Sequence, residues 1–182
     1  MSRSTRIVQV KDLKIGGGNP IAVQSMCATH TRNIDATVAQ ILMLQAAGAD
    51  LIRVAVDNKL DVDALKEIRR QTLPSKARLV VDLQENYPLA EFVAPYVDKM
   101  RYNPGHLHHL NKDVPVKEKV RWLVEIAKKN GNALRIGVNC GSVAPEFLER
   151  YPGDHVRAIV ESAAWHCSLM DEFGFKNFVV SL

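Results

Sequence analysis

Cysteine is scarce in this sequence: Cys27, Cys140 and Cys167 are its three cysteines among 182 residues. An odd number at wide spacings argues against a disulfide framework and supplies no C-x-x-C metal motif. Cluster-binding cysteines usually stand in short local spacings, and no such spacing occurs here. We therefore expect three free thiols.

Long apolar runs are also missing. A typical apolar segment, Leu51–Val56, contains an arginine and falls far short of the roughly 20 residues that a membrane helix needs. The N-terminus is polar and basic, and no apolar signal region follows it. The sequence thus predicts no membrane association and a cytoplasmic location.

Clusters of basic residues are absent as well. Lysine and arginine outnumber aspartate and glutamate by 24 to 20, which gives a net charge of +4, but the basic residues are scattered along the chain. A nucleic-acid-binding domain would gather them into a patch. We expect no nucleic acid partner, whereas the positive balance permits an anionic ligand.

The sequence does contain a regular alternation of short apolar and longer amphipathic segments, after a candidate hairpin at residues 7–15 that ends in a glycine-rich turn. Six candidate strands are Ile21–Gln24, Leu51–Val56, Arg78–Asp82, Lys99–Tyr102, Leu134–Val138 and Asn177–Leu182. Five candidate helices are Ile34–Ala47, Asp61–Gln71, Pro88–Ala94, Pro115–Asn130 and His155–Phe173.

Repeated strand–helix units predict an α/β fold with a parallel sheet, either doubly wound or closed as a barrel. A dinucleotide-binding sheet would carry G-x-G-x-x-G after its first strand, whereas Gly16–Gly18 precede that strand here. The pattern favours a TIM-type (β/α)8 barrel. Because a closed barrel needs eight strands and about 250 residues, we expect residues 1–182 to be an incomplete barrel of about six βα units, a fragment of a longer protein.

Arginines interrupt three of the predicted strands: Arg53, Arg101 and Arg135. A buried guanidinium without a partner costs several kcal/mol, so each one needs a carboxylate or a ligand. Side chains alternate along a strand, so the arginines share a face with polar residues at or just past the strand ends. Those polar residues are Asp82, Gln84, Asn103 and Asn139. We expect this face to point into the barrel lumen and its polar rim to surround the C-terminal mouth.

Converging guanidinium groups suit a phosphorylated ligand, above all a diphosphate, because they bind phosphate oxygens in pairs and stay charged. The candidate substrate-binding residues are Arg53, Asp82, Gln84, Arg101, Asn103, Arg135 and Asn139. The alternative is structural: one arginine pairs with Asp82 while the others lean toward solvent. We identify no catalytic residue and no metal ligand in the sequence.

Six segments carry a family resemblance: Ile15–Ile21, Val23–Met26, Asp35–Ile41, Ala47–Val56, Arg101–Gly105 and Arg135–Asn139. In this order and spacing they are highly specific, and together they cover nearly the whole chain. The sequence resembles the 4-hydroxy-3-methylbut-2-en-1-yl diphosphate synthases of the methylerythritol phosphate pathway of isoprenoid precursor synthesis.

The resemblance implies an oxidoreductase that reductively opens methylerythritol cyclodiphosphate to hydroxymethylbutenyl diphosphate. It also implies a 4Fe-4S cluster in a small C-terminal domain outside these 182 residues, a flavodoxin or ferredoxin electron donor, and a homodimer of the full-length protein. By motif match, Arg53, Arg101 and Arg135 would hold the diphosphate, with Asn103 and Asn139 as hydrogen-bonding partners. The fragment alone is expected to be inactive.

Two features depart from the family pattern. Gln84 stands where the family commonly has a histidine, and glutamine can donate a hydrogen bond but cannot carry a proton. The loop with His106, His108 and His109 also differs, and the sequence assigns it no role. The runner-up interpretation is a pterin- or corrinoid-binding TIM-type barrel module, which predicts fewer lumen arginines. A barrel lyase or aldolase would require a Schiff-base lysine or metal ligands at a strand end, and we identify neither.

Overall fold

The computed structural model describes residues 5–182. Six parallel strands form one sheet in chain order: β3 (Gln24–Met26), β4 (Leu51–Ala55), β5 (Leu79–Asp82), β6 (Lys99–Tyr102), β7 (Ala133–Gly137) and β8 (Phe178–Ser181). Strands β3 and β8 are the two edges, so the sheet is an open half-barrel. The predicted TIM-type fold with about six βα units is confirmed.

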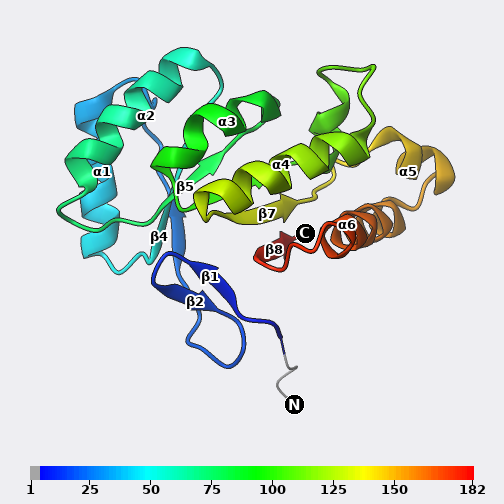
Figure 1. Ribbon diagram of the computed structural model, residues 1–182, viewed down its shortest axis with the longest axis horizontal. Coiled ribbons are helices and arrows are strands. Elements are labelled where there is room, and N and C mark those ends of the chain that lie inside the picture. Colours follow the sequence, from blue (N-terminus) through cyan, green and yellow to red (C-terminus); the bar gives the residue numbers. More distant parts are fainter. Residues whose placement is uncertain (1–4) are drawn as a thin grey trace.

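The connections between the strands are helical and lie together on one side of the sheet (Figure 1). The α-helices are α1 (Ile34–Ala46), α2 (Lys59–Thr72), α3 (Ala90–Val93), α4 (Val116–Asn130), α5 (Pro145–Arg150) and α6 (His155–Glu172). Three short 3-10 helices are η1 (Tyr87–Leu89), η2 (Ala94–Tyr96) and η3 (Pro104–His108). Helix α2 begins with a capping box between Asn58 and Asp61, and α4 ends at Gly131, whose φ of 70° suits glycine.

The two faces of the sheet pack into different clusters, as strand alternation predicts. The main core joins the helices to the residues that face them, among them Ile52, Val54, Met100, Tyr102, Ile136 and Val138. The opposite face forms the lumen, where Leu51, Val80 and Ala133 pack against Val8 and Val10. The lumen therefore has an apolar end that an N-terminal element covers.

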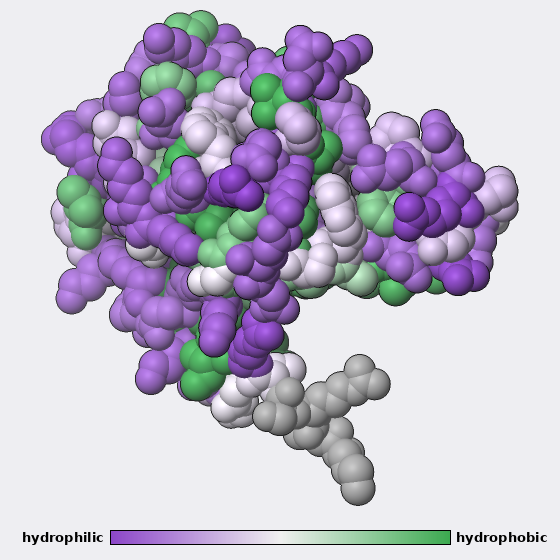
Figure 2. Space-filling view, turned by 45° about the vertical axis from the view of Figure 1, so that its right-hand side comes forward, coloured by the Kyte–Doolittle hydropathy of each residue, from purple (hydrophilic) through white to green (hydrophobic). Residues whose placement is uncertain are grey.

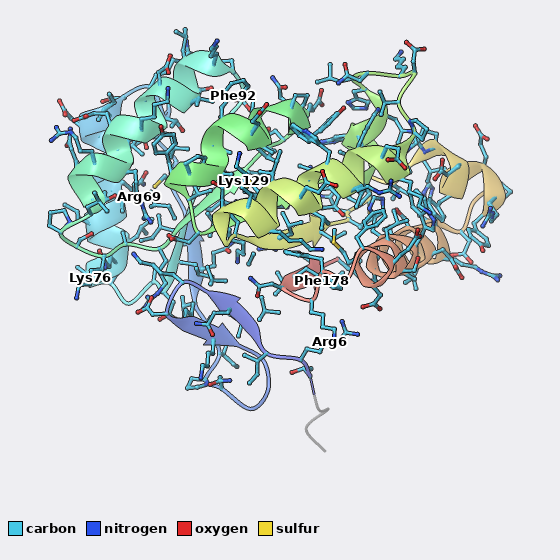
Figure 3. The ribbon with its side chains drawn as sticks, in the orientation of Figure 1. Arg6, Arg69, Lys76, Phe92, Lys129 and Phe178 are labelled. Atoms are coloured by element: carbon cyan, nitrogen blue, oxygen red, sulfur yellow. The ribbon has the colours of Figure 1, made fainter. Side chains whose placement is uncertain are left out.

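That covering element is the predicted hairpin, with β1 (Val8–Val10) antiparallel to β2 (Leu13–Ile15) (Figure 1). Arg78, just before β5, donates two hydrogen bonds of 2.7 and 2.8 Å to the Asp12 carboxylate. The side-chain amide of Asn177, just before β8, bonds to the backbone of Gln9. Arg6, which is labelled in Figure 3, pairs with Asp171 of α6 at 3.0 Å. Because both sheet anchors precede strands, the hairpin occupies the N-terminal end of the lumen.

Two predicted elements differ from the structure. The first barrel strand was expected at Ile21–Gln24 but begins at Gln24, because the Asp50 carboxylate and backbone take the hydrogen bonds of Val23. Ile21 is instead 92% exposed. The predicted helix at Pro88–Ala94 is a series of one-turn pieces, η1, α3 and η2, since prolines interrupt its backbone hydrogen bonds.

The outer surface is mostly hydrophilic on the face that Figure 2 shows, with small separate apolar patches. Within residues 5–182, none of the helices combines the length and the apolar character that crossing a bilayer requires.

Candidate functional site

Asp82 and Arg101 form the centre of the polar lumen. Asp82 ends β5 and Arg101 lies opposite it in the register of β6. One guanidinium nitrogen, Nη1, donates to both carboxylate oxygens at 3.1 and 2.9 Å. Both side chains are largely buried, with exposed fractions of 7% and 12%. The alternative that one arginine pairs with Asp82 thus holds for Arg101.

Arg53 reaches the same carboxylate from β4 at a longer distance. Its Nε lies 3.9 Å from Asp82 Oδ2, and the guanidinium also contacts the sulfur of Met26 on β3. An ion pair at 3.9 Å is looser than the hydrogen-bonded pair with Arg101. Asp82 is therefore shared unequally between two arginines.

Arg135 has no carboxylate partner among the described residues. It faces Arg101 in the register of β7, and its Nη2 donates to Ser181 Oγ on β8 at 2.6 Å, while its Nε is buried without a partner. Burial lowers the pKa of Arg135, and the neighbouring Arg53 and Arg101 add to this effect. An arginine nevertheless remains charged at working pH, so Arg135 is a cation without a counter-ion.

Lys99 adds a fourth cation that our prediction did not include. It starts β6, is 2% exposed, and reaches across the lumen to donate a 2.8 Å hydrogen bond to Gln24 Oε1 on β3. Burial lowers its pKa to about 8, with Arg135 and Arg53 contributing. The signal was present in the sequence, because Lys99 stands two residues before Arg101 and so shares its face.

A cleft of about 420 Å³ lies beside two of these cations, Lys99 and Arg135. Its walls come from β3, β6, β7, β8 and the hairpin, and its polar lining residues are Gln24, Lys99, Arg135 and Ser181. Among the described residues, we define the lumen cluster as Arg53, Asp82, Lys99, Arg101 and Arg135. The cluster thus contains four cationic side chains and one carboxylate, which is the charge pattern of an anion site.

At the C-terminal mouth, His106 contacts both Asn103 and Gln84. Asn103 is 5% exposed and its Oδ1 is buried without a partner. His106 Nδ1 lies 3.1 Å from Asn103 Nδ2 and 3.1 Å from the backbone oxygen of Gln84. Gln84 adopts a left-handed φ of 47°, so the alternation of side chains by which we predicted that it shares a face with Asp82 ends before this residue. Its side chain is exposed. His106 is a mouth residue that sequence reasoning left without a role.

Asn139 stands apart from the other candidates. Its side-chain oxygen accepts from Ser142 Oγ at 2.9 Å, and its backbone N–H donates to the same hydroxyl at 3.1 Å. These bonds fold the loop after β7, and Gly105 packs against that loop through a hydrogen bond to Ser142 O. In the described residues no hydrogen bond joins the Asn139 side chain to the lumen cluster.

Gly137 leaves the space that Arg101 occupies. A Cβ at this position would collide with Arg101 Nε. We expect Gly137→Ala to displace Arg101 from Asp82 and to lower the free energy of unfolding by about 1–3 kcal/mol, the usual cost of overpacking. Urea unfolding measures the loss. Gly141→Ala is the matched control, because a Cβ there meets only ordinary contacts and should leave stability unchanged.

The cysteines of the described residues do not fit an iron–sulfur cluster. Cys27 is buried after β3, Cys140 is exposed after β7, and Cys167 lies on α6. Burial raises the pKa of Cys27 to about 11 and also raises that of Cys167, whereas cluster ligands are thiolates. Within residues 5–182, no group of three or more histidine, cysteine or acidic side chains is placed to hold a metal ion.

Comparison with solved structures supports the fold. HPPK-DHPS from Plasmodium falciparum superposes with a TM-score of 0.67 at 13% identity, covering 96% of this chain and 32% of that one. A 7,8-dihydropteroate synthase from Vibrio fischeri gives 0.61 at 11%, covering 97% and 66%. A DAHP synthase from Thermotoga maritima gives 0.59 at 14%, covering 96% and 44%. At such identities the likeness shows the barrel fold alone.

Sequence comparison is more specific. Residues 5–182 match the GcpE TIM-barrel domain. The chain is 56% identical over 179 residues to a 4-hydroxy-3-methylbut-2-en-1-yl diphosphate synthase (flavodoxin) from Rhodopirellula baltica, covering 98% of this chain and 46% of that protein. A protein of the same name from Fusobacterium nucleatum is 42% identical over 184 residues, covering 100% and 49%.

The chain spans about half the length of these curated relatives. Its match to the barrel domain nevertheless extends over almost every residue. The alternative interpretation, a pterin-binding module, has only the fold likeness to the dihydropteroate synthases behind it. The sequence relatives are 4-hydroxy-3-methylbut-2-en-1-yl diphosphate synthases instead. The chain belongs to the GcpE family of 4-hydroxy-3-methylbut-2-en-1-yl diphosphate synthases, and its described residues form part of the TIM-barrel domain of that family.

Proposed function

We propose that this chain is the substrate-binding barrel of an oxidoreductase that reductively opens methylerythritol cyclodiphosphate to hydroxymethylbutenyl diphosphate. The names of the relatives support the activity. The observation that carries the role of this chain is the charge balance of the lumen cluster, which has four cations and one carboxylate: Asp82 pairs with Arg53 and Arg101, while Lys99 and Arg135 line the cleft without an acidic partner among the described residues. A diphosphate would supply the missing negative charge.

In this proposal the lumen cluster binds and orients the diphosphate. Arg53, Arg101 and Arg135 offer donors from three strands of the sheet, β4, β6 and β7, so a ligand in the lumen would be held from several sides. Donors fixed in a buried site stabilise negative charge as it develops on a leaving phosphate oxygen, because they need no reorganisation. Asn103 and Gln84 would contact the remainder of the substrate at the mouth, and Asn139 would do so from the loop after β7.

The proposal also includes a 4Fe-4S cluster, an electron donor and a second subunit. Since the described residues do not fit the cluster, its ligands would come from another part of the protein. Flavodoxin is the favoured donor because the relatives carry it in their names, and ferredoxin is the alternative. A homodimer of the full-length protein and a cytoplasmic location complete the proposal.

Calorimetric titration of the full-length protein with the cyclic diphosphate tests this function. We expect Arg135→Met to weaken binding roughly ten- to hundredfold, the effect of losing a charge-assisted hydrogen bond. Arg135 is suited to the test because its one described hydrogen bond is to Ser181, so the substitution breaks no ion pair.

Arg121→Met on the outer face of α4 is the control. Arg121 pairs with Glu118 on the exposed side of that helix, and its loss should leave the affinity unchanged. Equal affinities of the wild type and the Arg135 variant would contradict the proposed binding site.

A further inference from the structure

The positive charge of the lumen cluster is compensated unevenly. Arg101 holds both oxygens of Asp82, and Arg53 lies 3.9 Å from the same carboxylate. The other two cations, Lys99 and Arg135, have no acidic partner among the described residues. The uncompensated positive charge of the cluster therefore lies at Lys99 and Arg135, where an anion would be most strongly attracted.

Lys99 is an unusual buried lysine. Its ammonium group can donate three hydrogen bonds, yet its described partner is one neutral amide oxygen, that of Gln24. Burying an ammonium without an acidic partner is costly. Lys119, which is equally buried at 2% exposure, shows the contrast: its ammonium donates to the carbonyls of Leu107 and Leu110 and so fastens a loop.

Lys99 and Arg135 line the same cleft of about 420 Å³, together with Gln24 and Ser181. Arg135 Nε is buried without a partner. Two cations with spare donors, an amide and a hydroxyl around one cavity match the oxygens of a phosphate group.

We propose that Lys99 and Arg135 form a phosphate subsite of their own, which binds one phosphate of the diphosphate while Arg53 and Arg101 contact the other. The inference rests on the proposed function and deepens it, because it makes Lys99 a ligand-binding residue and assigns the two phosphates to different cations.

Protonation of Lys99 follows from this placement. In the ligand-free lumen its pKa is about 8, lowered first by burial and then by Arg135 and Arg53. Gln24, to which Lys99 bonds, is neutral, and the Arg101–Asp82 pair stands two residues farther along β5 and β6 on the same face. A bound anion stabilises the charged ammonium and raises its pKa, so binding takes up about half a proton near pH 8.

Titration of the full-length protein with the cyclic diphosphate at pH 7, 8 and 9 tests the subsite. Each of its phosphates has a single ionisable oxygen, so its charge is constant over this range. We expect wild-type affinity to fall about tenfold from pH 7 to pH 9, as Lys99 loses its proton. Two buffers with different ionisation enthalpies measure proton uptake on the wild type directly, without a variant.

The Lys99 variants separate charge from structure. Lys99→Met should bind roughly ten- to hundredfold more weakly at pH 7 and lose the pH dependence, whereas Lys99→Arg should keep affinity at pH 9. Lys119→Met removes an equally buried lysine outside the lumen and should change stability but not affinity or its pH dependence.

Wild-type affinity and pH dependence in Lys99→Met, or no proton uptake by the wild type, would overturn the subsite while leaving the proposed function intact. If none of the proteins binds the cyclic diphosphate, the proposed function fails. Sulfate, whose charge is also constant from pH 7 to 9, then tests the subsite alone: binding that requires Lys99 supports it, and binding independent of Lys99 refutes it.

Discussion

Asp82→Ala is expected to destabilise the ligand-free protein by about 3–5 kcal/mol, the usual cost of removing one partner from a buried ion pair. The carboxylate holds Arg101 through two hydrogen bonds and also accepts one from the backbone N–H of Gln84. Without it, the lumen contains four cations and no described counter-ion. Urea unfolding, analysed by linear extrapolation, measures the loss.

An added anion should restore part of this stability, because it would replace the carboxylate among the freed cations. Asp98→Ala is the matched control, since Asp98 is 9% exposed and its carboxylate pairs at 2.9 Å with Arg69 of α2 rather than with a residue of the lumen cluster. Sulfate should raise the stability of Asp82→Ala more than that of Asp98→Ala. An equal response of both variants would show that the lumen has no particular affinity for anions.

Acidification from pH 6.5 to pH 4.5 is expected to cost about 2–3 kcal/mol of stability through His166. This residue on α6 is fully buried, and burial lowers its pKa to about 3. In the unfolded chain the pKa is about 6.5. Below that value the unfolded state binds a proton that the folded state does not, so stability is complete above pH 6.5 and falls by about 1.4 kcal/mol per pH unit down to the folded pKa.

Two variants isolate the contribution of His166. His166→Phe removes the titrating group and should flatten the pH dependence of stability between pH 6.5 and 4.5. Tyr102→Phe removes the 3.1 Å hydrogen bond to His166 Nδ1 but keeps the imidazole, so the slope should persist even if overall stability falls. An unchanged slope in His166→Phe would assign the acid sensitivity to other groups.

The sequence predicted the side of the sheet on which most strand residues lie, because alternation is a local property of extended chain. Arg53, Arg101 and Arg135 lie on the lumen face, while Ile52 and Met100 lie in the helix-facing core. The same rule puts Lys99 on the lumen face, but a single lysine at the start of a strand did not stand out in the sequence as a binding residue. Its bond to Gln24 connects β6 to β3, two strands that do not pair.

Other details depend on contacts between distant segments and could not be predicted. The start of β3 is set by hydrogen bonds between Val23 and Asp50, which are 27 residues apart. The left-handed turn at Gln84 ends the alternation on which its assignment rested. The position of His106 against Gln84 results from the packing of two loops. Such features require the assembled sheet.

The two edges of the half-barrel have a consequence for handling the protein. On their outer sides, β3 and β8 have no neighbouring strand among residues 5–182. An unpaired edge presents a row of free backbone donors and acceptors and is a template for strand addition by another chain. If no further strands cover these edges, the chain would be prone to self-association that increases with concentration. Ligand titrations are therefore best carried out on a protein whose sheet is complete.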